Sequence, residues 1–453
     1  MHNAFVTAAA LSAALAALAT TAAAQAIRIE PATEVARETD PRRLSEPHLA
    51  IHPADPDRLL AAAFITPLSE NVPEMLAGAR CATFASRDGG RTWTRHDFPL
   101  THCGDPQVAI LAGGQAVFLA LADAPGVQGS SWLTAFHSND AGFTWDGTPV
   151  LIGRGHDHPA IVVDESSSRR RGWIYVTTHY GWRDGNGELG SSVFVARARD
   201  GGKSFDRATE VSPSTLHNFG EMPAVLSDGT LVSSFVDDAW NRPGFERRRA
   251  WVMRSTDGGT TFSPPRLAND VCGPPPGFQL SALVADTSDG PFKDRLYFAC
   301  RRSAGGPVVV ASSGDKGDTW NRPGVVAGSD QVDSDTRRVM TLAVNPRGVL
   351  GVLVVERRVK ASDSCLEATF SASHDGGATF SPSQRVAMSS CSASPVDLIA
   401  TRMFPTYGDY YGLVTTPDGR FRAMWPEMRD GASVLLTTTI EVDGSARPPT
   451  PKP

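Results

Sequence analysis

The sequence contains very little lysine: only five of its 43 basic residues are Lys, and the rest are Arg. Acidic residues outnumber basic ones by 49 to 43, which gives a formal net charge of −6. A protein that binds nucleic acid needs a basic surface, so we expect no nucleic-acid partner. The arginine excess also means that one exposed Arg is weak support for a functional role.

Long apolar runs are also scarce. After residue 19 no segment approaches 18 consecutive apolar residues, so we expect no membrane span in the mature protein. Residues 4–19, "AFVTAAALSAALAALA", are apolar but short, and an A-x-A pattern at Ala22–Ala24 precedes Gln25. We interpret residues 1–24 as a signal peptide, although the first three residues lack a positive charge, and expect a secreted or periplasmic protein.

Cysteine is infrequent, and no pair has the C-x-x-C spacing of a structural zinc site. All six cysteines follow the proposed signal peptide, and an even number in an oxidising compartment favours disulfides. Six cysteines allow 15 pairings, of which the spacing favours three local ones. These are Cys81–Cys103, Cys272–Cys300 and Cys365–Cys391.

What the sequence does contain is a short turn that recurs six times, beginning with "SRDGGRTW" at residue 86 and ending with "SHDGGATF" at residue 373. Short β-rich runs lie between the copies, with almost no helical periodicity. The central aspartates are 52 to 60 residues apart: Asp88, Asp140, Asp200, Asp257, Asp315 and Asp375. This period predicts an all-β fold, a β-propeller built from four-stranded antiparallel blades.

The recurring turn has a structural explanation. Its Asp carboxylate can accept hydrogen bonds from backbone N–H groups two or three residues further on, and its Gly permits a left-handed backbone. The aromatic residue that ends the turn can pack against the blade. Because a residue required in every repeat serves the repeat, we interpret the six aspartates as structural.

The motif S-x-D-x-G-x-[TS]-[WF] resembles the Asp-box, or bacterial neuraminidase repeat, of the sialidase superfamily. Its six copies cover about 290 residues of this chain. The resemblance implies a propeller and, as an activity, a glycoside hydrolase of the exo-α-sialidase type. The motif also occurs in propellers without activity, so the alternative is a non-catalytic propeller that binds glycan or protein.

The number of blades follows from a second pattern, in which a polar residue precedes an apolar innermost strand. It occurs seven times, at Glu46, Asp105, Asp157, Glu221, Gln279, Arg338 and Asp409. Seven blades are therefore favoured over the six of known sialidases. The last unit has only three strands, and residues 26–35 are predicted to close it as the fourth. We expect one domain over residues 26–442 and a disordered Pro-rich tail at 443–453.

These seven polar residues are expected opposite the recurring turns, around the central funnel. A sialidase would place there an arginine clamp for the substrate carboxylate, a Tyr nucleophile polarised by a Glu, and an acid–base Asp. As catalytic residues we predict Tyr407, Glu356 and Asp409, with Tyr410, Tyr411 and Glu427 as alternatives. The predicted ligand-binding residues are Arg183, Arg302, Arg338, Arg358, Arg429, Asp105, Asp157 and Glu221.

Other candidates in this region are weaker. The arginine that starts the first blade of a sialidase is missing, with Glu46 in its place, so individual arginines are not matched to the clamp. The loops also carry Tyr180, Trp182 and the pair Asp237–Asp238. The polar ring has a structural alternative, because its acids can accept hydrogen bonds from backbone N–H groups of neighbouring blades.

No cofactor or metal is predicted. His156 and His158 flank Asp157, but a loop histidine pair without a third ligand is more often structural. The carboxylates of the ring give Ca²⁺ a weak alternative. The expected partner is a glycan or glycoconjugate, with a protein ligand as the alternative, and the protein is expected to be a monomer.

Overall fold

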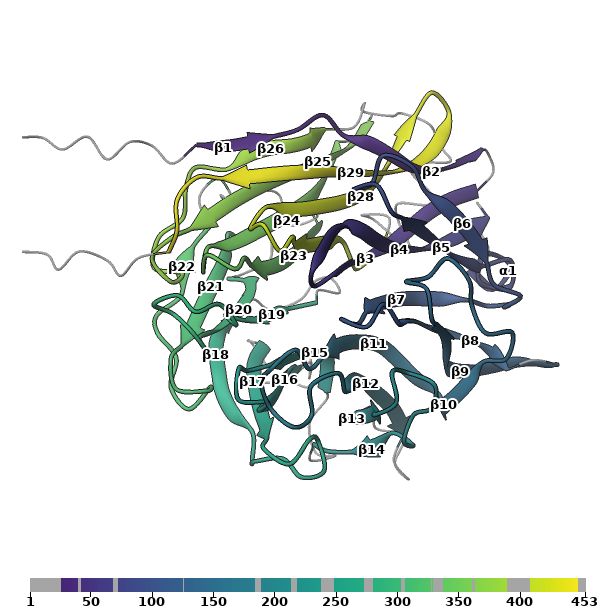
Figure 1. Ribbon diagram of the computed structural model, residues 1–453, viewed down its shortest axis with the longest axis horizontal. Helices are drawn as coiled ribbons and strands as arrows, with labels where there is room; N and C mark the ends of the chain where they lie inside the picture. Colours follow the sequence, from purple (N-terminus) through teal and green to yellow (C-terminus); the bar gives the residue numbers. More distant parts are fainter. Residues whose placement is uncertain are drawn as a thin grey trace, which may run out of the picture.

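The computed structural model shows seven β-sheets arranged in a ring around a central axis (Figure 1). The seven innermost strands contact one another in chain order, and the last contacts the first. They are β3 (Arg42–His52), β7 (Gly104–Ile110), β11 (His156–Val163), β15 (Asn218–Val225), β19 (Ala282–Ala285), β23 (Arg337–Val344) and β27 (Gly412–Thr415). The predicted seven-bladed propeller is confirmed, and the six-bladed alternative is wrong.

The structure describes most of the chain after residue 25. The described ranges are 26–39, 42–67, 72–124, 126–183, 189–212, 218–237, 248–272, 280–302, 306–326, 328, 337–360, 363–388 and 408–446. The predicted signal peptide lies outside them. Residues 443–446, the start of the predicted tail, are described, and the backbone N–H of Ala446 donates to the Arg347 carbonyl at 3.0 Å. Within the described ranges no helix is long and apolar enough to cross a membrane.

Each of the first six blades is an antiparallel sheet whose strands run outward from the axis in chain order. The first blade continues from β3 with β4 (Asp55–Pro67), β5 (Arg80–Ser86) and β6 (Thr94–Asp97). The second continues from β7 with β8 (Ala116–Ala124), β9 (Val127–Ser138) and β10 (Val150–Arg154). The third continues from β11 with β12 (Ile174–Arg183), β13 (Leu189–Ala198) and β14 (Thr209–Glu210). The fourth blade continues from β15 with β16 (Leu231–Asp237), β17 (Arg248–Ser255) and β18 (Arg266–Cys272). The fifth continues from β19 with β20 (Leu296–Arg301), β21 (Val308–Ser313) and β22 (Gly324–Val325). The sixth continues from β23 with β24 (Leu350–Lys360), β25 (Asp363–Ser373) and β26 (Gln384–Met388). The short helix α1 (Val72–Ala77) joins β4 to β5.

The seventh blade is completed by the N-terminal segment, as predicted. After β27 it contains β28 (Phe421–Arg429) and β29 (Ala432–Val442), and both β1 (Ile27–Ile29) and β2 (Thr33–Thr39) pair antiparallel with β29. The closing segment is interrupted at residues 30–32, where Pro31 has no N–H to donate to a ladder. Because the two ends of the domain share one sheet, the ring has no open blade edge at its junction.

The hydrophobic core lies between neighbouring blades. Between the sixth and seventh blades, Phe370, Phe421 and Trp425 are fully buried, and the rings of Phe370 and Phe421 lie 5.2 Å apart. The sheets therefore bury both faces, which explains why so many strands are continuous apolar runs rather than alternating ones.

The six recurring turns join the third and fourth strands of their blades and share one hydrogen-bond pattern. In the turn at Asp257, Oδ1 accepts the N–H groups of Thr260 and Thr261, both at 3.0 Å, and Oδ2 accepts the Thr261 hydroxyl at 2.7 Å. The donors stand three and four residues after the Asp, one residue further than predicted. In all six turns the Asp accepts both the N–H and the hydroxyl of the residue four positions on.

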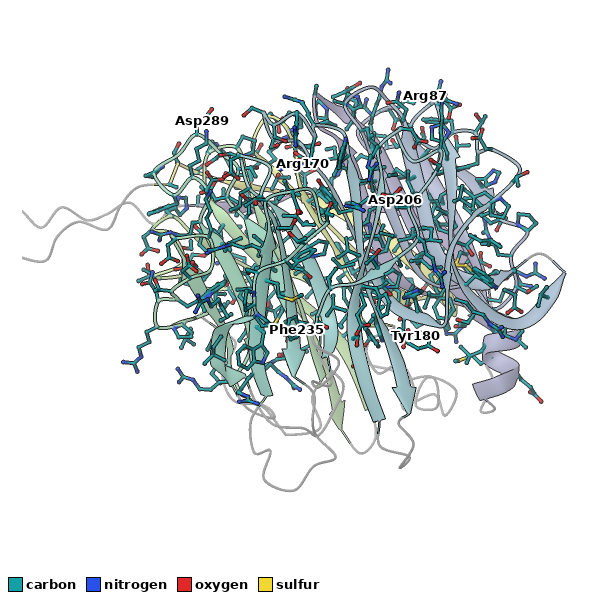
Figure 2. The ribbon with its side chains drawn as sticks, turned by 90° about the horizontal axis from the view of Figure 1, so that it is seen from below. Arg87, Arg170, Tyr180, Asp206, Phe235 and Asp289 are labelled. Carbon is teal, nitrogen blue, oxygen red and sulfur yellow. A yellow bond between two sulfur atoms is a disulfide. The ribbon has the colours of Figure 1, made fainter. Side chains whose placement is uncertain are left out.

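The turns define one side of the ring, here called the box face; the opposite side, with the loops between second and third strands, is the funnel face. Figure 2 views the ring from its edge, with Arg87 of the first turn toward one face and Tyr180 toward the other. The innermost strands enclose a cavity of about 670 Å³ along the axis. At its box-face end the cavity is lined by Glu165, Arg171 and Lys293.

One of the three predicted disulfides is described in full. The bond between Cys81 and Cys103 is present, with a Cα–Cα distance of 5.7 Å. Cys300 is also disulfide-bonded, while the side chain of its predicted partner, Cys272, is outside the described set. The side chain of Cys365 and the whole of Cys391 also lie outside it, so these two pairings stay predictions.

Candidate functional site

The funnel-face end of the axis is where polar side chains from four blades converge. They come from a β-bulge at the start of β3, β7 and β11, and from the residues before β27. In each bulge the residue before a proline has a positive φ: 49° at Glu46, 51° at Asp105 and 47° at His158. Non-glycine residues rarely adopt this conformation, and such strain is typical of functional sites.

The bulges revise one member of the predicted polar ring. In the third blade, His158 rather than Asp157 occupies the position equivalent to Glu46 and Asp105, because it is the residue that precedes the proline. Asp157 stands one residue earlier and pairs with His179 of β12. Two polar residues precede Pro159, so the pattern of polar and apolar residues alone did not decide which of them occupies the bulge.

The ring acids do connect neighbouring blades through backbone N–H groups, as the structural alternative predicted. The Asp105 N–H donates to Oε2 of Glu46 at 3.3 Å, and the His158 N–H donates to Oδ2 of Asp105 at 3.1 Å. Each carboxylate thus accepts a hydrogen bond from the following blade. Among the described residues, these two hydrogen bonds link the first three blades at the funnel face.

Burial makes the carboxyl groups of this cluster weaker acids than usual. Glu46 is only 2% exposed, and burial together with the charges of Asp105 and Asp409 raises its pKa well above the usual range. Burial also raises the pKa of Asp105; His158 opposes this shift, and Asp157 reinforces it. Since the Glu46 and Asp105 side chains are hydrogen-bonded to each other, one of the two must carry a proton.

Tyr410 of the last blade reaches the same cluster. Its hydroxyl lies 2.7 Å from Nδ1 of His158. Burial and the nearby carboxylates of Asp105 and Glu46 raise the pKa of the Tyr410 phenol well above its usual value. The phenol therefore keeps its proton, and it shares a hydrogen bond with Nδ1 of His158.

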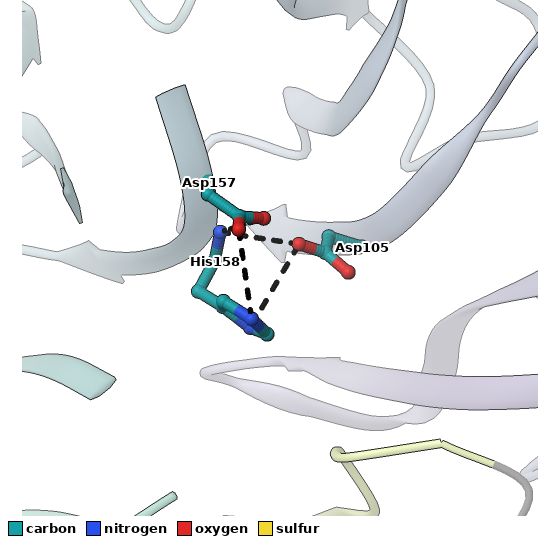
Figure 3. A group of neighbouring side chains, drawn as sticks. All are labelled: Asp105, Asp157 and His158. Atoms are coloured by element: carbon teal, nitrogen blue, oxygen red, sulfur yellow. Dashed lines mark hydrogen bonds and ion pairs between the residues drawn. The ribbon is translucent and has the colours of Figure 1, made fainter. Parts of the chain in front are cut away.

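Asp105, Asp157 and His158 form the centre of the cluster (Figure 3). One carboxylate oxygen or ring nitrogen from each lies within 4.8 Å of the others. The Asp157 side chain is 54% exposed, whereas those of Asp105 and His158 are 13% and 11% exposed. The set includes an imidazole, whereas Ca²⁺ takes oxygen ligands, so it fits the Ca²⁺ alternative poorly.

Several predicted residues are engaged elsewhere. Arg338 is buried, with its Nε 2.8 Å from Oε2 of Glu356, and this ion pair lies across the β23–β24 register. Arg429 forms an ion pair with Glu427, which also accepts the indole N–H of Trp425 at 2.9 Å. Arg338, Glu356 and Arg429 are therefore already paired with protein groups of opposite charge.

The other predicted residues divide into three groups. Asp409 is half-buried, and its charge acts on both Glu46 and Tyr410, so it belongs to the cluster. Arg302 is exposed at the end of β20. The predicted nucleophile and three of the predicted ligand-binding side chains lie outside the described set: Tyr407, Arg183, Arg358 and Glu221.

The structure thus brings together Asp105, Asp157 and Asp409 from the prediction. It adds His158, which the sequence offered only within a weak metal site, and it brings there the hydroxyl of Tyr410, an alternative catalytic residue of the prediction. The signal for the bulges was present in the sequence, because Glu46, Asp105 and His158 are each followed by proline at the start of an apolar strand.

No family model matches the sequence, and no curated protein matches it. Among solved structures, a protein of unknown function from Dyadobacter fermentans has a TM-score of 0.51 and 13% identity, over 92% of this chain and 99% of its own. An α-L-arabinofuranosidase from Fusarium graminearum has a TM-score of 0.48 and 10% identity, over 91% of this chain and 97% of its own.

A Trypanosoma rangeli sialidase mutant displaying trans-sialidase activity has a TM-score of 0.44 and 13% identity. That alignment covers 77% of this chain and 55% of the sialidase. At these identities the likeness concerns the fold alone.

Proposed function

We propose that the protein is an exported glycoside hydrolase whose active site is the carboxyl cluster at the funnel face. The observation that carries the proposal is the spacing of Asp105 and Asp157, which have carboxylate oxygens within 4.8 Å of each other. Retaining glycosidases place their two carboxyl groups about 5–5.5 Å apart, whereas inverting enzymes leave a larger gap for a water molecule.

The two aspartates have different surroundings, as the two roles require. Asp105 is buried beside Glu46 and hydrogen-bonded to it, and burial raises the pKa of both, so a proton held by the pair is available to Asp105 as the general acid. Asp157 has a solvent-exposed carboxylate that can approach the anomeric carbon. We therefore assign Asp105 as acid–base and Asp157 as nucleophile.

In the first step the Asp105 proton passes to the glycosidic oxygen as the bond from that oxygen to the anomeric carbon breaks. An Asp157 oxygen bonds to the same carbon and forms a glycosyl ester. In the second step Asp105 takes a proton from water, the water oxygen bonds to the anomeric carbon, and Asp157 leaves as carboxylate. The hydrogen bond from the His158 N–H holds Asp105 in position throughout.

The charge of the site favours a neutral sugar. Glu46, Asp105, Asp157 and Asp409 gather at one point, and a substrate carboxylate would be repelled by any of them that is ionised. Sialic acid would need the arginine clamp, for which Arg183, Arg302 and Arg358 are the remaining candidates. The sialidase hypothesis, with Tyr407 as nucleophile, is therefore kept as the competing substrate class.

A non-catalytic glycan-binding or protein-binding propeller is the second candidate. The observation that favours it is the hydrogen bonding of Glu46 and Asp105 to backbone N–H groups of the next blade. These hydrogen bonds give both acids a structural role that does not require catalytic activity.

The test measures the purified mature protein against fluorogenic glycosides: an α-sialoside, an α-L-arabinofuranoside and neutral hexosides. We expect turnover of a neutral glycoside, and a fall of at least about 100-fold in both Asp105→Asn and Asp157→Asn. Asp206→Asn, an exposed acid near the box face, is the matched control and should keep wild-type activity.

The other outcomes separate the alternatives. Turnover of the α-sialoside that is lost in Tyr407→Phe but kept in Asp157→Asn would replace the proposed site with the sialidase one. An absence of turnover on every substrate, with both Asn variants folded, would leave the non-catalytic propeller.

A further inference from the structure

We propose that Tyr180 is a stacking platform for a neutral sugar ring, in a binding subsite on the third blade at the funnel face; the inference rests on the proposed glycan chemistry of the carboxyl cluster. Tyr180 lies near the funnel-face end of β12 (Figure 2). The residue is 39% exposed, and among the residues whose burial the structure describes it is the only aromatic in the set of exposed large hydrophobic residues.

The Tyr180 ring is held in place by two other aromatic rings. The ring centroid of His156 lies 6.0 Å from that of Tyr180, and the Phe194 centroid lies 6.2 Å from it, with interplanar angles of 65° and 72°. His156 and Phe194 also meet edge to face at 5.1 Å. Edge-to-face packing fixes the plane of the Tyr180 ring without stacking a second ring upon its face.

Two glycines make room for this arrangement. A Cβ on Gly155, which has a φ of +73°, would lie 2.7 Å from Cε2 of Tyr180. A Cβ on Gly153 would lie 2.5 Å from Nε2 of His156. Any larger residue at either position would displace a ring, so the segment Gly153–His156 has the shape that the platform requires.

The platform carries no charge at neutral pH. Burial, with a contribution from His179, lowers the pKa of His156 to about 4, so its imidazole is neutral. The exposed face of a tyrosine ring is electron-rich and apolar, and it attracts the weakly positive C–H groups on one side of a sugar ring. An anionic sugar gains nothing from such a surface, which agrees with the negative character of the carboxyl cluster.

The register places the platform in the same blade as Asp157 but on its other face. His156 pairs with Tyr180, and the adjoining pair is Asp157 with His179, whose Nε2 lies 3.9 Å from Oδ2 of Asp157. Because successive side chains of a strand point to opposite faces, Tyr180 and Asp157 lie on opposite faces of the third blade. The platform would therefore bind a sugar unit beyond the one at the cleaved bond.

A purely structural role for the Tyr180 ring makes a different prediction. If its packing with His156 and Phe194 only stabilises the third blade, Tyr180→Ala should lower the melting temperature without affecting sugar affinity. The platform instead predicts a loss of affinity that Tyr180→Phe restores, because Phe keeps the ring face and removes only the hydroxyl.

The experiment measures binding of arabinobiose, cellobiose and lactose to the full-length mature protein by titration calorimetry. It also measures kcat and KM on aryl glycosides of one and two sugar units. For the disaccharide that binds best, Tyr180→Ala should weaken binding about tenfold, and Tyr180→Phe should stay within about twofold of wild type. Leu267→Ala, an exposed apolar residue on β18, is the control and should bind normally.

The two proposals fail in different ways. Hydrolysis by the wild type, with an unchanged KM for the two-unit substrate in Tyr180→Ala, would overturn the platform and leave the glycosidase standing. Disaccharide binding that depends on Tyr180, without turnover, would overturn the glycosidase and leave the platform standing. No binding and no turnover would overturn both.

Discussion

The hydroxyl of Tyr410 and Nδ1 of His158 share a hydrogen bond of 2.7 Å, and this contact joins the last blade of the ring to the third. The first and second blades lie between them in the ring and contribute Glu46 and Asp105 to the same cluster. The backbone N–H of His158 also donates to Oδ2 of Asp105. His158 therefore links side chains of the second and last blades, which are not neighbours.

Replacing Tyr410 with Phe should test this link. The variant leaves the ring in the core but removes the hydroxyl, so the nearly buried His158 loses this hydrogen bond. We expect a loss of about 1–3 kcal/mol in the free energy of unfolding, measured by chemical denaturation. An unchanged free energy of unfolding in Tyr410→Phe would show that this hydrogen bond contributes nothing to the stability of the fold.

The recurring turns provide a second prediction. Partial burial opposes ionisation of Asp257, but the hydrogen bonds from Thr261 and Ser255 lower its pKa from 3.8 to about 2. Asp257→Ala removes the acceptor of four donors and should cost about 1–3 kcal/mol, while funnel-face binding stays intact. Asp257→Asn is the control: it keeps Oδ1 as an acceptor and should cost less.

The pKa of Asp257 also sets the pH range of this effect. The stabilisation by the carboxylate is present above pH 3.8 and is lost as the pH falls toward 2, because protonation removes the charged acceptor. The melting temperatures of wild type and Asp257→Ala should therefore converge between these values. A loss of ligand binding at an unchanged melting temperature would contradict the structural interpretation.

The buried carboxyl pair predicts the opposite dependence on pH. Because the pKa of Glu46 is raised in the folded state, the folded protein binds this proton more tightly than the unfolded chain, and stability falls as the pH rises through the folded-state pKa. Gln resembles the protonated acid. Glu46→Gln should thus be more stable than wild type at pH 8, with little difference at pH 4. A melting temperature of Glu46→Gln that exceeds that of wild type at no pH would show that the folded protein does not hold Glu46 in its protonated form.

The pairing of the remaining cysteines follows from the order of the blades. Non-reducing peptide mapping of protein isolated from an oxidising compartment should find Cys272–Cys300 and Cys365–Cys391 beside the observed Cys81–Cys103. Either pair would link neighbouring segments at the funnel face. A bridge between distant blades, or free thiols, would show that the strands are wrongly assigned on that side.

The blade count and the N-terminal closure could be predicted because they depend on a pattern that repeats in every blade. The turn of Asp257 recurs six times, and residues 26–35 resemble the strand that follows it. Because the spacing is nearly the same from copy to copy, the repeat can be recognised even where the bounds of a single strand are ambiguous. The same reasoning predicted that acids at the innermost strands would accept backbone N–H groups from the next blade.

The funnel face was harder to predict because its contacts join residues that no local pattern relates. Arg338 was assigned to ligand binding, but the β23–β24 register places it opposite Glu356, which neutralises it. Tyr410 is one of two tyrosines that the sequence offers as alternatives to Tyr407; its hydroxyl reaches His158, and only closure of the ring brings the two together. In the third blade, two polar residues before Pro159 left the bulge position undecided.

The stereochemistry of hydrolysis tests the central claim most directly, because it depends on the separation of Asp105 and Asp157. Proton NMR of the first sugar released from the glycoside that the wild type cleaves would identify its anomeric configuration. Carboxylate oxygens within 4.8 Å are close to the separation of about 5–5.5 Å in retaining enzymes and well below the about 6.5–9.5 Å of inverting ones, so we expect retention. Inversion of the anomeric configuration would contradict it.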